Sequence, residues 1–317
     1  MRWVPVTLLL LTTAALPVAA RPEGVRVVAT FSNLVYDLKL ISCPQDEIDY
    51  LAPPGLDPHD YELRPGDLEK LRRADLILSL AHAPFEVSVR ELISKGEIKA
   101  KLIEVPSIEG IRIYSNPLTG QPNYHMPIYD PMNYLVLMRE LREALKELNP
   151  TCSETYDMNY LEVENRVRSI VMEARRMNLT ALASTPIAQY ALEWLGIEVR
   201  FLLMKEEGIS ATPSELSEIY RAARNKEIGI VVTVGDESTP VNLKAIEIAD
   251  EFGIRRVNVP SPLEGSSIPD KLTKLIRALK EEGVGSKPAN TIDLTSTLIL
   301  AVSVMLIAIY FLRKKRS

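Results

Sequence analysis

Short apolar runs alternate with longer amphipathic segments from Val25 onward. This alternation is typical of βα units around a parallel sheet, so we expect an α/β protein with two lobes that have separate cores, each on a parallel four-stranded sheet. In the first lobe the pattern predicts strands at Val25–Val28, Asp49–Leu51, Leu76–Leu80 and Lys101–Val105 and helices at Asn33–Leu40, Pro65–Arg73, Phe85–Ser94 and Pro131–Leu148. In the second it predicts strands at Ala181–Ala183, Glu198–Leu203, Ile228–Val234 and Arg256–Val259 and helices at Ile187–Leu195, Thr212–Asn225, Asn242–Phe252 and Asp270–Glu282.

One long helix is expected between the two sets. The segment from Ser153 to Arg176 has no Gly or Pro and carries charge pairs four residues apart, such as Glu162 and Arg166. We therefore place a rigid linking helix at residues 151–177, between an N-terminal metal-binding lobe at 21–150 and a C-terminal lobe at 178–283. A stiff connector permits small rocking motions and argues against wide hinge closure.

The two ends of the chain predict export and a membrane anchor. Residues 1–20 combine Arg2, a short apolar run and a small-residue cleavage site, which indicates a signal peptide. After a linker at 284–293, Leu294–Leu312 is uncharged and long enough to span a bilayer, and a basic tail follows at 313–317. We therefore expect an extracellular body, anchored to the cell membrane by one C-terminal transmembrane helix with a cytoplasmic tail.

Charge and cysteine content narrow the classes of partner. The 317-residue chain has a formal net charge of −5, which argues against nucleic acid as a partner. Cys43 and Cys152 are its only cysteines, and they form either one disulfide or two free buried thiols. Neither has the spacing of a zinc–thiolate site. We expect a monomer.

The chain has only three histidines, His59, His82 and His125, and each lies after a predicted strand or just before a predicted helix. Loops at the carboxyl ends of parallel strands share one edge of a sheet, where ligands bind. Prolines flank all three histidines and stiffen these loops. The three imidazoles can therefore converge on one point.

Three imidazole nitrogens suit a divalent transition metal and leave a fourth position for water or a carboxylate. Nitrogen-rich coordination favours Zn²⁺, whereas Mn²⁺ prefers more oxygen, and cobalt, nickel or copper stay open. Nearby carboxylates could orient the rings from outside the coordination sphere. The candidates are Asp57, Asp60, Glu62 and Glu86.

The run Pro53–Leu68 is similar, nearly residue for residue, to the Pro-Pro-Gly-x-Asp-Pro-His-Asp-Tyr-Glu-x-x-Pro-x-Asp-Leu run of the zinc/manganese TroA-like solute-binding proteins of ABC importers. His125 ahead of Tyr129-Asp130-Pro131 resembles that family's second histidine, and the likeness extends over most of Val25–Glu282. The resemblance implies that His59 and His125 are metal ligands. It also implies an ABC permease and its ATPase as partners.

The second lobe departs from the family pattern. Ser184-Thr185-Pro186 stands where the family places a His or Glu, and Pro260-Ser261-Pro262 stands where it places an Asp, with Glu264 the nearest carboxylate. Either the site has moved into the first lobe with His82 as third ligand, or the protein is a degenerate receptor of low affinity. We favour the first, in which Thr185, Ser261 and Glu264 close over the ion through oxygen or water.

The leading interpretation is therefore a non-catalytic extracellular receptor that captures a divalent metal, foremost zinc, and delivers it to an ABC importer. One alternative is a zinc-dependent surface hydrolase or lyase, with Glu62 or Asp60 as general base. Another is a degenerate receptor that acts as an adhesion or structural protein.

Overall fold

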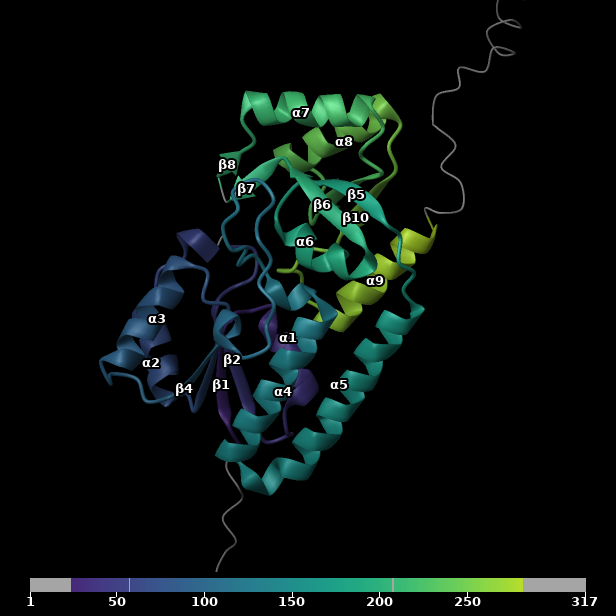
Figure 1. The fold of residues 1–317 in the computed structure, drawn as a ribbon. Coiled ribbons are helices and arrows are strands. Elements are labelled where there is room, and N and C mark those ends of the chain that lie inside the picture. The colour runs from purple at the N-terminus through teal and green to yellow at the C-terminus, as the bar shows by residue number, and fades with distance from the viewer. Residues whose placement is uncertain (1–23, 57, 207, 282–317) are drawn as a thin grey trace, which may run out of the picture.

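The computed structural model describes residues 24–56, 58–206 and 208–281, which form two parallel β-sheets flanked by helices (Figure 1). The predicted signal peptide, linker, transmembrane segment and basic tail lie outside these residues. Within the described ranges, no helix is both long enough and apolar enough to cross a membrane.

The first sheet has the strand order β2-β1-β3-β4, and every neighbouring pair is parallel. Its strands follow the predicted apolar runs, because β1 and β3 are buried along almost their whole length. The strands are β1 (Arg26–Phe31), β2 (Glu47–Ala52), β3 (Leu76–Ser79) and β4 (Lys101–Glu104). The helices are α1 (Leu34–Ile41), α2 (Pro65–Arg73), α3 (Pro84–Ser94) and α4 (Pro131–Leu148).

The second sheet has the order β10-β9-β5-β6 and is also parallel throughout. Its strands are β5 (Leu179–Ala183), β6 (Ile197–Leu202), β9 (Ile230–Val234) and β10 (Arg256–Val259), and its helices are α6 (Ile187–Leu192), α7 (Pro213–Arg224), α8 (Pro240–Phe252) and α9 (Ile268–Glu281). In both sheets the first strand lies between the second and the third. The strand order therefore reverses beside the first strand, which is where ligands bind in open α/β sheets.

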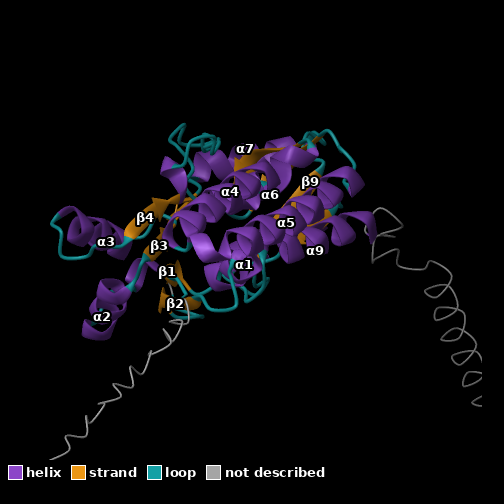
Figure 2. Cartoon of the chain, turned by 90° about the horizontal axis from the view of Figure 1, so that it is seen from below, coloured by secondary structure: helices purple, strands orange, loops and turns teal. Residues whose placement is uncertain are grey.

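The long connecting helix is confirmed as α5 (Ser153–Glu173). It contacts α1 and α4 of the first half and α9 of the second, and Figure 2 shows α4, α5 and α9 lying along one another. An ion pair between Arg166 on α5 and Asp270 on α9, 2.6 Å apart, joins the helix to the second half. The connector therefore packs against both halves along its length.

The sequence predicted a separate core for each lobe, but the two halves share one core. One cluster of buried side chains continues from the first sheet through α4 and α5 to β5, β9 and α9 of the second half. A smaller cluster lies under α7 and α8. The halves share a core because helices of both, together with α5, pack at their junction.

Two features of the chain were not predicted as elements. A short antiparallel hairpin, β7 (Met204–Glu206) and β8 (Ile209–Ser210), follows β6. Single 3₁₀ turns also occur, and one of them takes over the end of the helix predicted at Ile187–Leu195. These turns span Pro58–Asp60, Val105–Ser107, Pro127–Tyr129, Pro150–Cys152 and Glu193–Leu195.

Cys43 and Cys152 form a disulfide that spans 109 residues of sequence. It joins the turn before β2 to the turn that leads into α5. Of the two alternatives that the sequence leaves open, the structure has the bonded pair.

Candidate metal centre

A cleft of about 750 Å³ lies where the carboxyl-terminal edges of the two sheets face each other. Its walls come from the segments that follow β1, β2, β3, β5, β9 and β10, together with the loop before α4. All six site residues named from the sequence line it: His59, His82, His125, Thr185, Ser261 and Glu264.

The three imidazoles meet in this cleft. The Nε2 atoms of His59 and His82 are 3.4 Å apart, and the ring centroids of His82 and His125 are 4.5 Å apart. Two nitrogens bound to one tetrahedral Zn²⁺ at 2.0–2.1 Å lie about 3.3 Å from each other. The His59–His82 separation is therefore that of two ligands on one ion.

A buried carboxylate holds the loop of His82. Glu86 on α3 is 1% exposed, and its Oε2 accepts hydrogen bonds from the backbone N–H groups of His82 at 2.7 Å and Ala83 at 2.9 Å. Its Oε1 accepts from the Ser79 hydroxyl and the Leu80 N–H. Glu86 therefore positions the backbone at His82, whereas the sequence suggested that it orients the ring.

The orientation of the His125 ring is set by Asn123, which is fully buried. The Asn123 Nδ2 donates to Pro186 O at 3.0 Å and to Gln189 Oε1 at 2.9 Å, so its Oδ1 is the acceptor that faces His125. This oxygen accepts from the His125 backbone N–H at 3.0 Å and from ring Nδ1 at 2.9 Å. The proton of the neutral ring is therefore on Nδ1, and Nε2 presents its lone pair to the cleft.

His59 lies in the 3₁₀ turn Pro58–Asp60, and the chain after it is held by Asp67. The Asp67 Oδ2 accepts from the Tyr61 hydroxyl at 2.7 Å and the Arg64 N–H at 2.8 Å. Of the other carboxylates suggested near the rings, Asp60 and Glu62 are exposed to solvent, and Asp57 lies outside the described residues.

Burial keeps two of the imidazoles neutral. Desolvation, with a smaller contribution from the neighbouring His82 and His59, lowers the pKa of His125 to about 4. The pKa of His82 is also lowered, first by desolvation and then by His59. Since a metal binds the unprotonated ring, these two side chains are in the ligand form at neutral pH.

The three second-lobe residues named from the sequence line the opposite side of the cleft. The Glu264 carboxylate is exposed and pairs with Lys274 at 2.9 Å, while Ser261 Oγ accepts from the Leu263 N–H at 3.2 Å. The Thr185 hydroxyl is buried without a hydrogen-bond partner in the described part of the chain.

One carboxylate beside the histidines was not predicted from the sequence. Glu206, at the end of β7, has its Oε2 at 3.4 Å from His125 Nε2. A carboxylate at the tip of a Gly-containing hairpin, just after a strand exit, is the signal that could have drawn attention to it. The Asn–x–His spacing was the corresponding signal for Asn123.

The candidate ligands form two close pairs, His59 with His82 and His125 with Glu206, and not a complete coordination site. No group of three or more His, Cys, Asp or Glu side chains among residues 24–56, 58–206 and 208–281 meets the geometry of a metal site.

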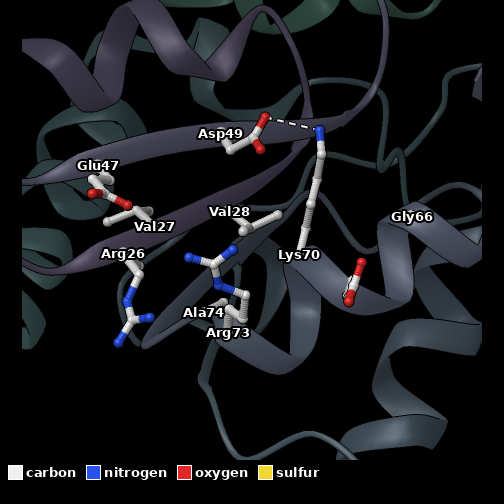
Figure 3. Close-up of a pocket in the computed structure, with 10 residues that line it drawn as sticks. Arg26, Val27, Val28, Glu47, Asp49, Gly66, Lys70, Arg73 and Ala74 are labelled. Atoms are coloured by element: carbon white, nitrogen blue, oxygen red, sulfur yellow. Dashed lines mark hydrogen bonds and ion pairs between the residues drawn. The ribbon is translucent and has the colours of Figure 1, made fainter.

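A second hollow, of about 220 Å³, lies along β1, β2 and α2 and is drawn in Figure 3. Both pairs of charges recorded there are ion pairs of the protein itself: Lys70 Nζ lies 2.9 Å from Asp49 Oδ1, and Arg26 lies 3.4 Å from Asp75. No histidine lines it. The cleft between the sheets is therefore the better candidate for a metal site.

The chain is similar in sequence to known metal-binding proteins. Residues 27–282 match the family model described as "Zinc-uptake complex component A periplasmic". The chain is 24% identical over 241 residues to the iron-binding protein YfeA of Yersinia pestis, covering 72% of this chain and 74% of that protein. It is 25% identical over 262 residues to the manganese-binding lipoprotein MntA of Halalkalibacterium halodurans, covering 77% and 82%.

Solved structures share the fold. The solute-binding protein FpvC of P. aeruginosa in complex with Ni²⁺ superposes with a TM-score of 0.67 at 16% identity, covering 84% of this chain and 99% of that one. The crystal structure of ZnuA superposes with a TM-score of 0.65 at 18% identity, covering 83% and 100%.

Members of the matched family are substrate-binding proteins and not enzymes, so the alternative of a surface hydrolase or lyase is dropped. The matched range includes the loops of all three histidines and both sheets. The chain belongs to the family of zinc-uptake complex component A, the metal-binding solute-binding proteins of ABC importers.

Proposed function

We propose that this receptor carries Zn²⁺ and that His59, His82 and His125 bind the ion through their ring nitrogens. The observation that carries the proposal is the convergence of the only three histidines of the chain in one cleft, with two Nε2 atoms 3.4 Å apart. Structural and transport sites for zinc commonly use imidazole nitrogen at 2.0–2.1 Å.

Ligand type supports zinc over manganese. Three nitrogens suit zinc, whereas manganese favours sites rich in carboxylate oxygen. Relatives are named for manganese and iron, and FpvC was solved with Ni²⁺, so the metal has to be decided by the donors of this chain. Here the donors are mostly nitrogen.

We further propose that the receptor works outside the cell and is tethered by residues 294–312, with residues 1–20 removed on export. Several relatives are named lipoproteins, which carry a lipid on cysteine. Both cysteines of this chain are joined in the disulfide, so neither is available for a lipid. A transmembrane helix then supplies the anchor. The receptor consists of an N-terminal lobe (21–150), a linking helix (151–177) and a C-terminal lobe (178–283), and it delivers the ion to an ABC permease with its ATPase.

The test is zinc binding by the purified full-length chain, followed by thermal unfolding and by competition with a chromophoric chelator. At free zinc 100 times Kd, binding to the native state should stabilise it by about 2.7 kcal/mol and raise the Tm. His59→Ala and His125→Ala should each weaken affinity about tenfold or more. Glu97→Gln, an exposed change outside the cleft, is the matched control and should bind as the parent does.

Manganese, iron and nickel in parallel titrations decide the metal. Tighter binding of manganese than of zinc would contradict the zinc assignment. A chain that no divalent metal stabilises would be the degenerate receptor, and the proposal would be lost.

A further inference from the structure

We propose that Glu206 is the fourth ligand of the metal, supplying a carboxylate oxygen from the second half of the chain and closing the site between the two sheets. The inference rests on the proposed function, since it concerns the same ion. It assigns the closing role to the β7–β8 hairpin rather than to Thr185, Ser261 or Glu264.

The His125 ring faces Glu206 with its Nε2 atom. Reversing the Asn123 amide would place its NH₂ against the His125 N–H and its oxygen against Pro186 O, so the observed amide orientation is required. With Asn123 Oδ1 as acceptor, the ring donates from Nδ1 and its Nε2 is a bare lone pair.

The gap between that lone pair and the carboxylate is short. His125 Nε2 and Glu206 Oε2 are 3.4 Å apart, and both atoms are acceptors. Two acceptors at this distance repel unless a proton or a metal cation lies between them, and a bound metal ion would fill this gap. For Zn–N of 2.0–2.1 Å and Zn–O of 2.0–2.2 Å in a tetrahedron, the N···O edge is about 3.4 Å.

Lysine and arginine side chains are the other cations that could form an ion pair with Glu206. In the described ranges no lysine or arginine forms an ion pair with it, and its neighbour Lys205 is engaged with Glu215 at 2.9 Å. The Glu206 side chain is 34% exposed, so it is only partly solvated. Among the described residues, the charged or ligating partner recorded beside Glu206 is therefore His125.

Hydrogen bonds hold the β7–β8 hairpin in place beside His125. Asn116 is buried, belongs to the segment before His125, and donates from Nδ2 to Lys205 O at 2.7 Å. On the other side, Met204 N–H donates to Ser184 O at 3.0 Å and Ala211 N–H to Leu203 O at 2.8 Å. The backbone next to Glu206 is thus fixed to both halves, which holds its carboxylate beside His125.

The experiment compares zinc binding by the full-length parent, Glu206→Gln and the control Glu198→Gln. Glu198 is an exposed carboxylate on the neighbouring strand β6, where it pairs with Arg200. A chromophoric chelator measures the zinc affinity, and X-ray absorption at the zinc edge measures the ligand set. We expect Glu206→Gln to lose affinity by about tenfold to a hundredfold, with Glu198→Gln unchanged.

Anomalous diffraction from crystals of the zinc-loaded parent gives a readout that needs no variant. A Glu206 oxygen at about 2.0–2.2 Å from the ion would support the ligand role. A water in that position, or unchanged affinity of a folded Glu206→Gln variant, would overturn it while leaving the histidine site in place. If the parent itself takes up no zinc, the proposed function fails first, and the two failures are told apart.

Discussion

Replacing Glu86 with glutamine should loosen the loop that carries His82. The Glu86 carboxylate accepts four hydrogen bonds, two on each oxygen, and all four donors lie in the β3–α3 turn. Glutamine keeps the shape of the side chain but turns one oxygen into a donor. Whichever oxygen is exchanged, the two donors that face it must turn to another arrangement or stay unpaired.

The cost follows from which pair is given up. The Ser79 hydroxyl can rotate to accept from the new NH₂, whereas the backbone N–H groups of His82 and Ala83 cannot, so the amide should face Ser79. Only the Leu80 N–H is then left unpaired. A hydrogen bond to a charged group contributes about 1.5–3 kcal/mol, so Glu86→Gln should lower the free energy of unfolding by about 2–3 kcal/mol.

Urea unfolding of the metal-free protein measures this loss, and chelator competition measures zinc affinity. Because Glu86 acts from outside the coordination sphere, affinity should fall about tenfold. Glu91→Gln on the same helix is the control: Glu91 is exposed, pairs with Lys95 at 3.6 Å, and should change stability by less than about 0.5 kcal/mol. If Glu86→Gln matched Glu91→Gln in both measurements, the positioning role would be refuted.

Three further predictions concern other parts of the molecule. His82→Ala should weaken zinc binding about tenfold or more, and an unchanged chelator titration would remove His82 from the ligand set. Burial raises the pKa of Asp37 to about 6, above the unfolded value of about 3.9, so the folded state binds this proton more tightly. The Asp37 contribution is therefore present below about pH 4 and is lost as the pH rises through 6, by about 3 kcal/mol at most; the difference in urea stability between the parent and Asp37→Asn should follow that curve, and a flat difference from pH 4 to 7 would contradict it. Cys43→Ser combined with Cys152→Ser opens a connection across 109 residues and should lower stability by about 2–5 kcal/mol in denaturant unfolding, against no change in the parent on adding an alkylating agent without reductant.

Much of the fold could be predicted because its strands are buried on both faces and read as apolar runs. Boundaries were less certain at the sheet edge: β2 begins at Glu47, two residues before the predicted start, where an exposed side chain gives no apolar signal. The β7–β8 hairpin was missed because Met204–Glu206 shows no alternation of apolar and polar residues and its pairing is short.

The site was predictable as far as strand exits determine it. His59, His82 and His125 could be placed together since parallel strands end at one edge, and the cleft does contain all three. Asn123 and Glu206 could not be placed in this way. Their positions depend on contacts between distant segments, such as Asn123 with Gln189 and Asn116 with Lys205, which no local pattern encodes.

The undivided core has a consequence for how the protein unfolds. Side chains of α5 and α9 belong to the buried cluster that both halves share, so separating the halves would expose a large apolar area to water. Calorimetry of the metal-free chain should accordingly show one main heat-absorption peak, and either half expressed alone should aggregate. We therefore expect the protein to unfold as one cooperative unit.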